Sequence, residues 1–170
     1  MHSRDLKLVL ILCMVLANTG CDQATKRVAR DRLSDRGTIS VVDQVLILRY
    51  VENDGGFLGL GCDMPRSVRV ILFIAFPLIV LECMFMYVML SQRIFWPMLM
   101  GFSFLLGGVI GNLIDRIMFD GRVSDFINVG IGRWFRTGIF NFADLSVMIG
   151  CLLILVSSLG AQRPTPAVNR

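Results

Sequence analysis

Long apolar stretches without charge dominate the chain, interrupted in one place by Glu82. These stretches are residues 8–21, 70–92, 94–114 and 145–162. A helix rises about 1.5 Å per residue and the hydrocarbon core of a bilayer is about 30 Å thick, so one crossing needs roughly 20 residues. The last three stretches are long enough for one crossing each, and the first reaches this length only by including the residues after Cys21. The pattern predicts four membrane spans, at about residues 8–28, 70–92, 94–115 and 140–161.

The connection after the first span predicts a small sheet. Residues 38–51 alternate loosely between polar positions and Ile, Val or Leu, which is typical of strands. We expect an extramembrane β-sheet cradle at about residues 36–66, lying on the membrane. The tail at residues 161–170 contains two prolines and is expected to be disordered. The fold class is therefore an all-α polytopic membrane protein with a small sheet, forming a single integral-membrane domain over residues 1–160.

The first stretch has a second interpretation. Arg4 and Lys7 precede it and small residues lead up to Cys21, a pattern also typical of a cleaved secretory or lipoprotein signal. Asn18, however, is polar where a lipoprotein cleavage site has an aliphatic residue, and three more spans follow. We therefore expect the first helix to stay attached.

Composition supports a membrane protein. Hydrophobic residues make up 55% of the 170 residues, charged residues make up 18%, and the mean hydropathy is +0.67. This composition excludes a disordered chain. Five cysteines are an odd number and three lie in apolar stretches, which argues against a disulfide scaffold, although Cys21 and Cys62 could pair. The net charge is +4, but the basic residues are not interleaved with aromatic residues in a soluble domain. A bilayer is therefore the expected partner and nucleic acid is not.

Four crossings bring the connections after the first and third spans to one face of the membrane, here called the polar face. Both termini and the turn at Arg93 lie on the other face. The polar face gathers these residues: Asp22, Asn53, Asn112, Asp115, Arg116, Asp125, Asn141 and Asp144. It also carries most of the basic residues, and the positive-inside rule taken literally would place it in the cytoplasm.

Two helix ends on the polar face carry polar residues at helical spacing. Asn112, Asp115 and Arg116 fall at i, i+3 and i+4, so they share one side of the third helix. Asn141 and Asp144 are one turn apart at the start of the fourth. A helix cap would explain Asn141. Asp144 has apolar neighbours at the membrane boundary, which is more typical of a functional acid.

Asp125 is a lone acid between apolar residues on the same face. Paired with Asp144 it could share one proton, and a protonated and an ionised aspartate together can activate water for peptide hydrolysis. The only histidine is His2, so a Ser/His or Cys/His nucleophile and a multi-histidine zinc site are disfavoured. A serine and lysine pair would have to use Lys7 or Lys26, and this option stays open.

Five motifs follow one another along nearly the whole chain. They are Asp22-Gln23-Ala24-Thr25-Lys26, Asn53 with Gly55 and Gly56, Gly111-Asn112-Leu113-Ile114-Asp115-Arg116, Val123-Ser124-Asp125-Phe126 and Phe140-Asn141-Phe142-Ala143-Asp144. In this order they resemble the motifs of the lipoprotein signal peptidase family, also called signal peptidase II.

The resemblance implies an aspartic endopeptidase of the bacterial inner membrane. Its substrates would be diacylglyceryl-modified prolipoproteins, cut immediately before the lipidated cysteine, without a metal or other cofactor. Asp125 and Asp144 match the catalytic positions of the family. Other characteristic positions, expected around the substrate, are matched by Asp22, Lys26, Asn53, Gly55, Asn112, Arg116 and Asn141. The family fold has four transmembrane helices, with a β-cradle and a short loop helix on the periplasmic side, which reverses the orientation given by the charge count.

One motif departs from the family pattern. Members usually read Asn-x-Gly-Ala-Ala-Phe, whereas this chain reads Asn53-Asp54-Gly55-Gly56-Phe57-Leu58. A large ring therefore stands where a small residue is expected, in a loop expected to contact lipid or peptide.

Two other classes of function stay open on the residues alone. In a small transporter or channel subunit, Glu82 deep in the second span would line a polar path with Asp115, Arg116 and Asp144. A structural membrane protein without catalysis would suit the small-residue pair Gly107 and Gly111, which lets helices approach closely.

Overall fold

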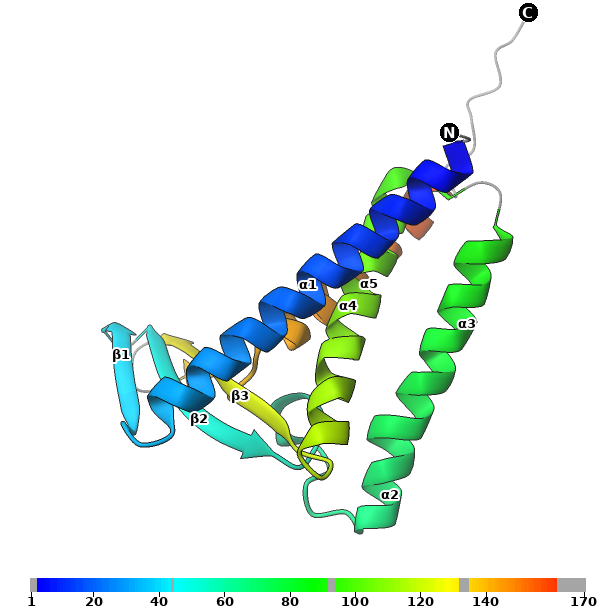
Figure 1. The fold of residues 1–170 in the computed structure, drawn as a ribbon. Coiled ribbons are helices and arrows are strands. Elements are labelled where there is room, and N and C mark those ends of the chain that lie inside the picture. Colours follow the sequence, from blue (N-terminus) through cyan, green and yellow to red (C-terminus); the bar gives the residue numbers. More distant parts are fainter. Residues whose placement is uncertain (1–2, 44, 92–93, 132–134, 162–170) are drawn as a thin grey trace, which may run out of the picture.

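The computed structural model describes residues 3–43, 45–91, 94–131 and 135–161. These residues form a bundle of helices with a sheet at one end (Figure 1). The tail expected to be disordered lies outside the described residues except for Ala161, and Arg93 lies outside them as well.

Four helical segments of the described chain are long and apolar enough to cross a membrane, as the sequence predicted. They are α1 (Ser3–Leu33); α2 (Arg66–Val70) with the π-helical turn η2 (Ile71–Ala75) and α3 (Phe76–Leu90); α4 (Trp96–Met118); and α5 (Phe142–Ala161). The π turn comes just before Pro77. Because proline has no N–H to donate to the preceding turn, a local widening of the helix accommodates it.

The helix α1 continues beyond residue 28, where the sequence placed the end of the first span. Its last turns are amphipathic: Ala29 and Leu33 are buried against Phe126, while Arg27 and Arg32 are exposed. An apolar stripe that packs on the sheet and a polar opposite side keep the helix regular outside its apolar stretch.

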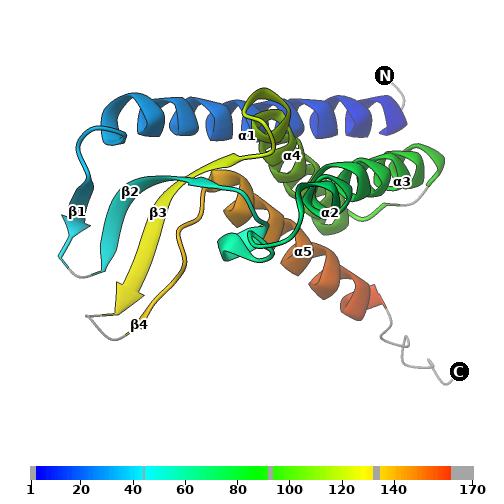
Figure 2. The same cartoon turned by 90° about the horizontal axis from the view of Figure 1, so that it is seen from below.

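The sheet lies beside the last turns of α1 (Figure 2). It is antiparallel, in the order β1 (Thr38–Val42), β2 (Leu46–Asn53), β3 (Val123–Ile131) and β4 (Phe135–Arg136). The predicted cradle is therefore present, but β3 and β4 come from the connection between the third and fourth spans, where no strand was predicted. The short loop helix implied by the family resemblance corresponds to a single 3₁₀ turn after β2, η1 (Phe57–Gly59).

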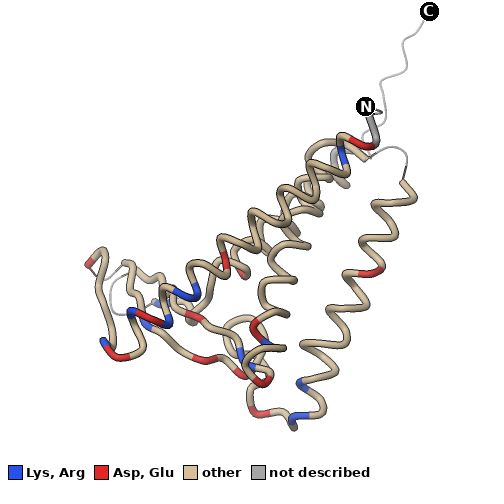
Figure 3. Tube along the Cα trace, viewed as in Figure 1, with Lys and Arg blue, Asp and Glu red and all other residues tan. Residues whose placement is uncertain are grey.

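Charged residues gather at the end of the bundle that carries the sheet (Figure 3). Glu82, an exposed side chain within α3, and Asp5 and Lys7 near the start of α1 are exceptions. The distribution agrees with a polar face formed by the connections after the first and third spans.

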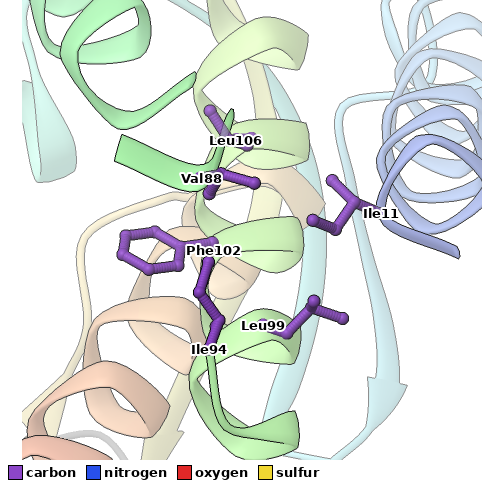
Figure 4. Packing of buried hydrophobic residues seen from close by; sticks show 6 residues of the cluster. All are labelled: Ile11, Val88, Ile94, Leu99, Phe102 and Leu106. Atoms are coloured by element: carbon purple, nitrogen blue, oxygen red, sulfur yellow. The ribbon is translucent and has the colours of Figure 1, made fainter. Parts of the chain in front are cut away.

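The central span is α4. Half of its most apolar stretch is buried, against 6% in the span formed by α2, η2 and α3. One buried cluster joins α1, α3 and α4, and it consists of Ile11, Val88, Ile94, Leu99, Phe102 and Leu106 (Figure 4). Small residues let α5 approach α4 closely from another side, since a Cβ on Gly150 of α5 would lie 2.6 Å from the backbone nitrogen of Leu105 of α4.

A methyl group at this crossing should destabilise the fold. We expect Gly150→Ala to lower the free energy of unfolding by about 1–3 kcal/mol, because backbone atoms of α4 cannot move aside as a flexible side chain could. Gly20→Ala is the matched control, since a Cβ there has no neighbour within 4 Å and alanine favours the helix by about 1 kcal/mol. Thermal unfolding in detergent compares them, and equal melting temperatures would contradict the close packing.

Candidate active site

The pairing of β2 with β3 brings the first two polar residues together. Val51 lies opposite Asp125, and Asn53 lies opposite Val123. Residues two apart on a strand point to the same side, so Asn53 and Asp125 are diagonal neighbours. Asn53 Nδ2 donates to Asp125 Oδ2 over 2.8 Å, and Asp125 is only 2% exposed.

A second carboxylate comes from the start of α5. Phe140 pairs with Ile127 of β3, which places Asn141 beside that strand. Asn141 Oδ1 accepts a hydrogen bond from the Asp144 backbone N–H over 2.9 Å, and Asp144 Oδ2 accepts one from the Asn141 backbone N–H over 3.1 Å. This reciprocal arrangement is a capping box. The cap interpretation therefore describes Asn141 correctly, and the same cap fixes the Asp144 carboxylate in one orientation.

The side chain of Asn141 also connects the two aspartates. Its oxygen is bound to the N–H of Asp144, and its nitrogen donates to Asp125 Oδ1 over 2.6 Å. Asn112 of α4 holds the other side of the pair, since its Nδ2 donates to Asp144 Oδ1 over 2.9 Å. Each buried carboxylate thus accepts two hydrogen bonds from donors fixed by helix or sheet.

A buried ion group from α1 supports this pair. Lys26 is 1% exposed, and its Nζ lies 2.9 Å from Asp22 Oδ2 and 3.6 Å from Asp115 Oδ2. The same ammonium donates to Asn112 Oδ1 over 2.9 Å. Because the oxygen of Asn112 is engaged in this way, its nitrogen is directed to Asp144.

Asp22 also fixes the position of α5. Its Oδ1 accepts a hydrogen bond from the backbone N–H of Ala143 over 2.9 Å, one of the N–H groups that a helix start leaves free. The contact requires close approach of α1 to α4, since a Cβ on Gly111 would lie 2.5 Å from Asp22 Oδ2. The Gly111 position therefore combines helix packing with construction of the site.

Arg116 reaches the site from the side of the loop after β2. Its Nη2 donates to the Gly55 carbonyl over 2.8 Å, and the Gly55 N–H donates to Asn53 Oδ1 over 2.8 Å. A Cβ on Gly55 would lie 2.6 Å from the carbonyl oxygen of Leu60, so the loop has room only for glycine at this point. Arg116 and Gly55 thereby hold the residue that binds Asp125.

The structure joins all nine site residues predicted from the sequence into one network of polar contacts. Its members are Asp22, Lys26, Asn53, Gly55, Asn112, Arg116, Asp125, Asn141 and Asp144. Gln23 and Ser124 were not predicted: Gln23 Nε2 donates to Asp115 Oδ1 over 3.1 Å, and the Ser124 N–H donates to Asp115 Oδ2 over 2.8 Å. Neither has a distinctive spacing, whereas the helical spacing of Asp115 from Asn112 was a usable signal.

The environment of Asp125 favours a bound proton. Burial first, and then the negative charge of Asp144, raises the pKa of Asp125 to about 7, against the opposing effect of its hydrogen bonds from Asn53 and Asn141. Two neighbouring carboxyl groups of this kind titrate as a pair and can share one proton.

A largely apolar cavity of about 460 Å³ opens beside Asp144. Its polar wall contains Asn112, Arg116 and Asp144, and its apolar wall includes Phe57 and Phe73. Phe57 is the ring that departs from the family pattern. The arrangement offers apolar space next to a buried pair of carboxyl groups.

The metal site and the disulfide considered from the sequence can be compared with the described residues. They contain no group of three or more His, Cys, Asp or Glu side chains arranged to hold a metal ion. Cys21 and Cys62 are both free and exposed, so the pairing left open by the sequence is not formed.

A family model described as signal peptidase (SPase) II matches residues 13–160. The chain belongs to the signal peptidase II family. A lipoprotein signal peptidase of Chlorobium phaeobacteroides (strain BS1) is 34% identical, with 86% of this chain and 94% of the relative covered. The lipoprotein signal peptidase of Bifidobacterium adolescentis is 31% identical, with 91% and 79% covered. A solved structure described as a bacterial membrane enzyme shares the fold, with a TM-score of 0.80, 24% identity and coverage of 95% and 94%.

Membership of the signal peptidase II family makes this chain a peptidase, and its four apolar helices make it a multi-pass membrane protein. None of these findings favours the transporter or channel alternative.

Removal of the buried ammonium should destabilise the protein strongly. Lys26→Met keeps much of the apolar bulk but leaves Asp22 and Asp115 without this counter-charge, and we expect a loss of about 3–5 kcal/mol in the free energy of unfolding. The neighbouring Arg27→Met is the control, since Arg27 is 82% exposed and its loss should change stability by about 0.5 kcal/mol or less. Denaturant unfolding measures both, and similar effects of the two variants would contradict the ion group.

Asp125→Asn should change how stability depends on pH. The pKa of Asp125 rises from 3.8 to about 7 on folding, so its contribution to stability is complete below about pH 4 and is lost as the pH rises towards about 7. Asparagine cannot ionise, so the variant should gain stability relative to the wild type over this interval, by at most on the order of 4 kcal/mol. Melting temperatures between pH 4 and pH 8 provide the test. A difference independent of pH would show that Asp125 ionises normally.

Proposed function

We propose that this protein is an aspartic endopeptidase that removes the signal peptide of bacterial prolipoproteins, cutting immediately before the diacylglyceryl-modified cysteine. The observation that carries the proposal is the pair of buried carboxyl groups, Asp125 and Asp144, joined through Asn141 at the edge of an apolar cavity. An aspartic mechanism needs two such groups that share a proton. The names of the relatives supply the class of substrate.

The proposed reaction uses water as the nucleophile. One carboxylate of the pair takes a proton from water as its oxygen attacks the scissile carbonyl, while the protonated partner donates a hydrogen bond to the developing oxyanion. Collapse of the tetrahedral intermediate breaks the carbon–nitrogen bond, and the amine of the modified cysteine leaves with a proton from the pair. The products are the free signal peptide and the lipidated mature protein, and the reaction requires no cofactor.

The remaining site residues position this pair and the substrate. Asn53, Asn112 and Asn141 would hold the carboxyl groups in their orientation through the amide contacts described above. Asp22 and Lys26 would fix Asn112 and the start of α5. Gly55 and Arg116 would set the position of the loop over the cavity, which could receive the signal segment of the substrate while its lipid chains remain in the bilayer.

We further propose that the polar face is periplasmic and that the protein resides in the bacterial inner membrane. The family resemblance supports this orientation over the charge count. Some arginines are bound within the folded polar layer, such as Arg116 and Arg30, which donates to Ser124 Oγ over 2.8 Å. Such arginines do not indicate on which side of the membrane the layer lies. Residues 1–160 would then form one peptidase domain, and residues 161–170 a cytoplasmic tail.

Asp125→Asn and Asp144→Asn test the proposal. Each change keeps the shape of the side chain but removes its ability to exchange a proton, so we expect at least a 100-fold loss of cleavage, roughly the order of effect of general acid–base catalysis. The assay uses the purified protein with a diacylglyceryl-modified precursor peptide, and cleavage before the modified cysteine is followed by mass spectrometry.

Asp35→Asn is the matched control, since Asp35 is an exposed residue after α1 and its loss should leave cleavage unchanged. Melting temperatures establish that the inactive variants are folded. Normal cleavage by folded Asp125→Asn or Asp144→Asn protein would exclude the aspartic mechanism. Failure of the wild type to cut the lipidated peptide would exclude the proposed substrate.

A further inference from the structure

We propose that a second cavity, between the start of α2 and the end of α4, binds a phosphate group. This cavity has a volume of about 260 Å³ and is separate in its lining from the apolar cavity except for Arg116. Its charged lining consists of Asp54, Arg66, Arg69, Arg116 and Asp120. The inference concerns binding and does not depend on the proposed peptidase activity.

The position of the cavity corresponds to the headgroup level of a bilayer. Arg66 is the first residue of the second candidate span and Met118 is the last of the third, so the cavity lies where two spans end on the polar face. Its apolar wall includes Val70 and Ile117, which are both exposed on the outside of the helices. A ligand could therefore contact charged groups on one side and membrane-facing residues on the other.

Two of the arginines have donors that the protein does not satisfy. The Nε–H groups of Arg69 and Arg116 are buried and have no hydrogen-bond partner among the described residues. Arg116 as a whole is only 8% exposed. A buried donor without an acceptor costs about 1–3 kcal/mol, so an acceptor supplied by a ligand would be favourable at this point.

The charges in the cavity favour an anion with several acceptor oxygens. Arg66 forms an ion pair with Asp120, and Arg69 Nη1 lies 3.1 Å from Asp54 Oδ1. Three guanidinium groups and two carboxylates thus line the cavity, and the guanidinium groups supply several N–H donors for the oxygens of a phosphate group. Arginine binds phosphate through paired N–H groups, and exposed partners such as Arg66 can turn towards a ligand.

The cavity is connected to the loop that follows Asn53, the last residue of β2. Arg69 donates to the carbonyl of Asp54 over 3.3 Å, and Arg116 donates to the carbonyl of Gly55. A phosphate bound between these arginines would connect α2, the loop and α4 through shared donors. Both a phospholipid headgroup and inorganic phosphate present this chemistry, and the experiment distinguishes them.

The test measures retention of lipid by the full-length protein with native mass spectrometry. The protein is delipidated in detergent, incubated with phosphatidylglycerol or with diacylglycerol, and washed. We expect the wild type to retain one phosphatidylglycerol molecule and at least tenfold less diacylglycerol, which lacks the phosphate. The double variant R66Q/R69Q should retain at least tenfold less phosphatidylglycerol, R66Q alone an intermediate amount, and the control R27Q the wild-type amount.

A parallel arm titrates inorganic phosphate by isothermal calorimetry. Phosphate binding that R66Q/R69Q abolishes, without retention of lipid, would support the site with the free ion as its ligand. R66Q retains the wild-type loop contacts of Arg69, so it remains informative if the double variant unfolds. The proposal would be overturned if the wild type retained measurable and equal amounts of diacylglycerol and phosphatidylglycerol, or if it bound neither phosphatidylglycerol nor phosphate. It would also be overturned if R66Q bound both lipid and phosphate as well as the wild type does.

Discussion

The burial of the Lys26 ammonium is the constraint on which the rest of the site depends. A charge with 1% exposure in an apolar bundle requires counter-charges and hydrogen-bond acceptors at fixed places, and these are Asp22, Asp115 and the side-chain oxygen of Asn112. Each partner also makes a second contact. Asp22 holds the start of α5, Asp115 holds the start of β3, and Asn112 directs its nitrogen to Asp144. One buried charge thus links α1 and α4, which carry its partners, to the starts of β3 and α5. Its loss would disturb the orientation of the carboxyl pair as well as stability.

Asn141 shows how a structural role and a functional role can coincide. The side-chain oxygen caps α5 and the side-chain nitrogen binds Asp125, so the amide uses both of its ends. Serine or threonine could cap the helix equally well, but neither has an NH₂ group that could bridge to the second carboxyl group. The residue type is therefore explained by the combination of the two contacts and by neither alone.

The sequence predicted the site residues, and helical spacing brought together those that lie on helices, but the contacts that depend on the sheet could not be predicted. The spans follow from length and hydropathy, and helical spacing places Asn112 with Asp115 and Asn141 with Asp144. The contact of Asn53 with Asp125 depends on the register of β2 against β3, which shifts between Leu48 and Val51 and cannot be read from either strand. The family motifs identified Asn53 as a site residue, but its partner became visible only with the sheet. The ion pairs of Arg69 with Asp54 and of Arg66 with Asp120 could not be predicted either, because they join segments that only the tertiary fold brings together.

The loop that departs from the family pattern places two aromatic rings beside the apolar cavity. A Cβ on Gly56 would lie 2.8 Å from Cε1 of Phe73, so the ring of Phe73 occupies space that the alanine usual at this position would need. The next residue adds a ring of its own, since Phe57 lines the apolar cavity together with Phe73. Gly56 thus gives room to the ring of Phe73, and Phe57 adds a ring to the cavity wall, while Arg116 of α4 still binds the Gly55 carbonyl. The departure therefore changes the shape of the apolar wall and leaves the hydrogen bonds from Gly55 through Asn53 to Asp125 in place.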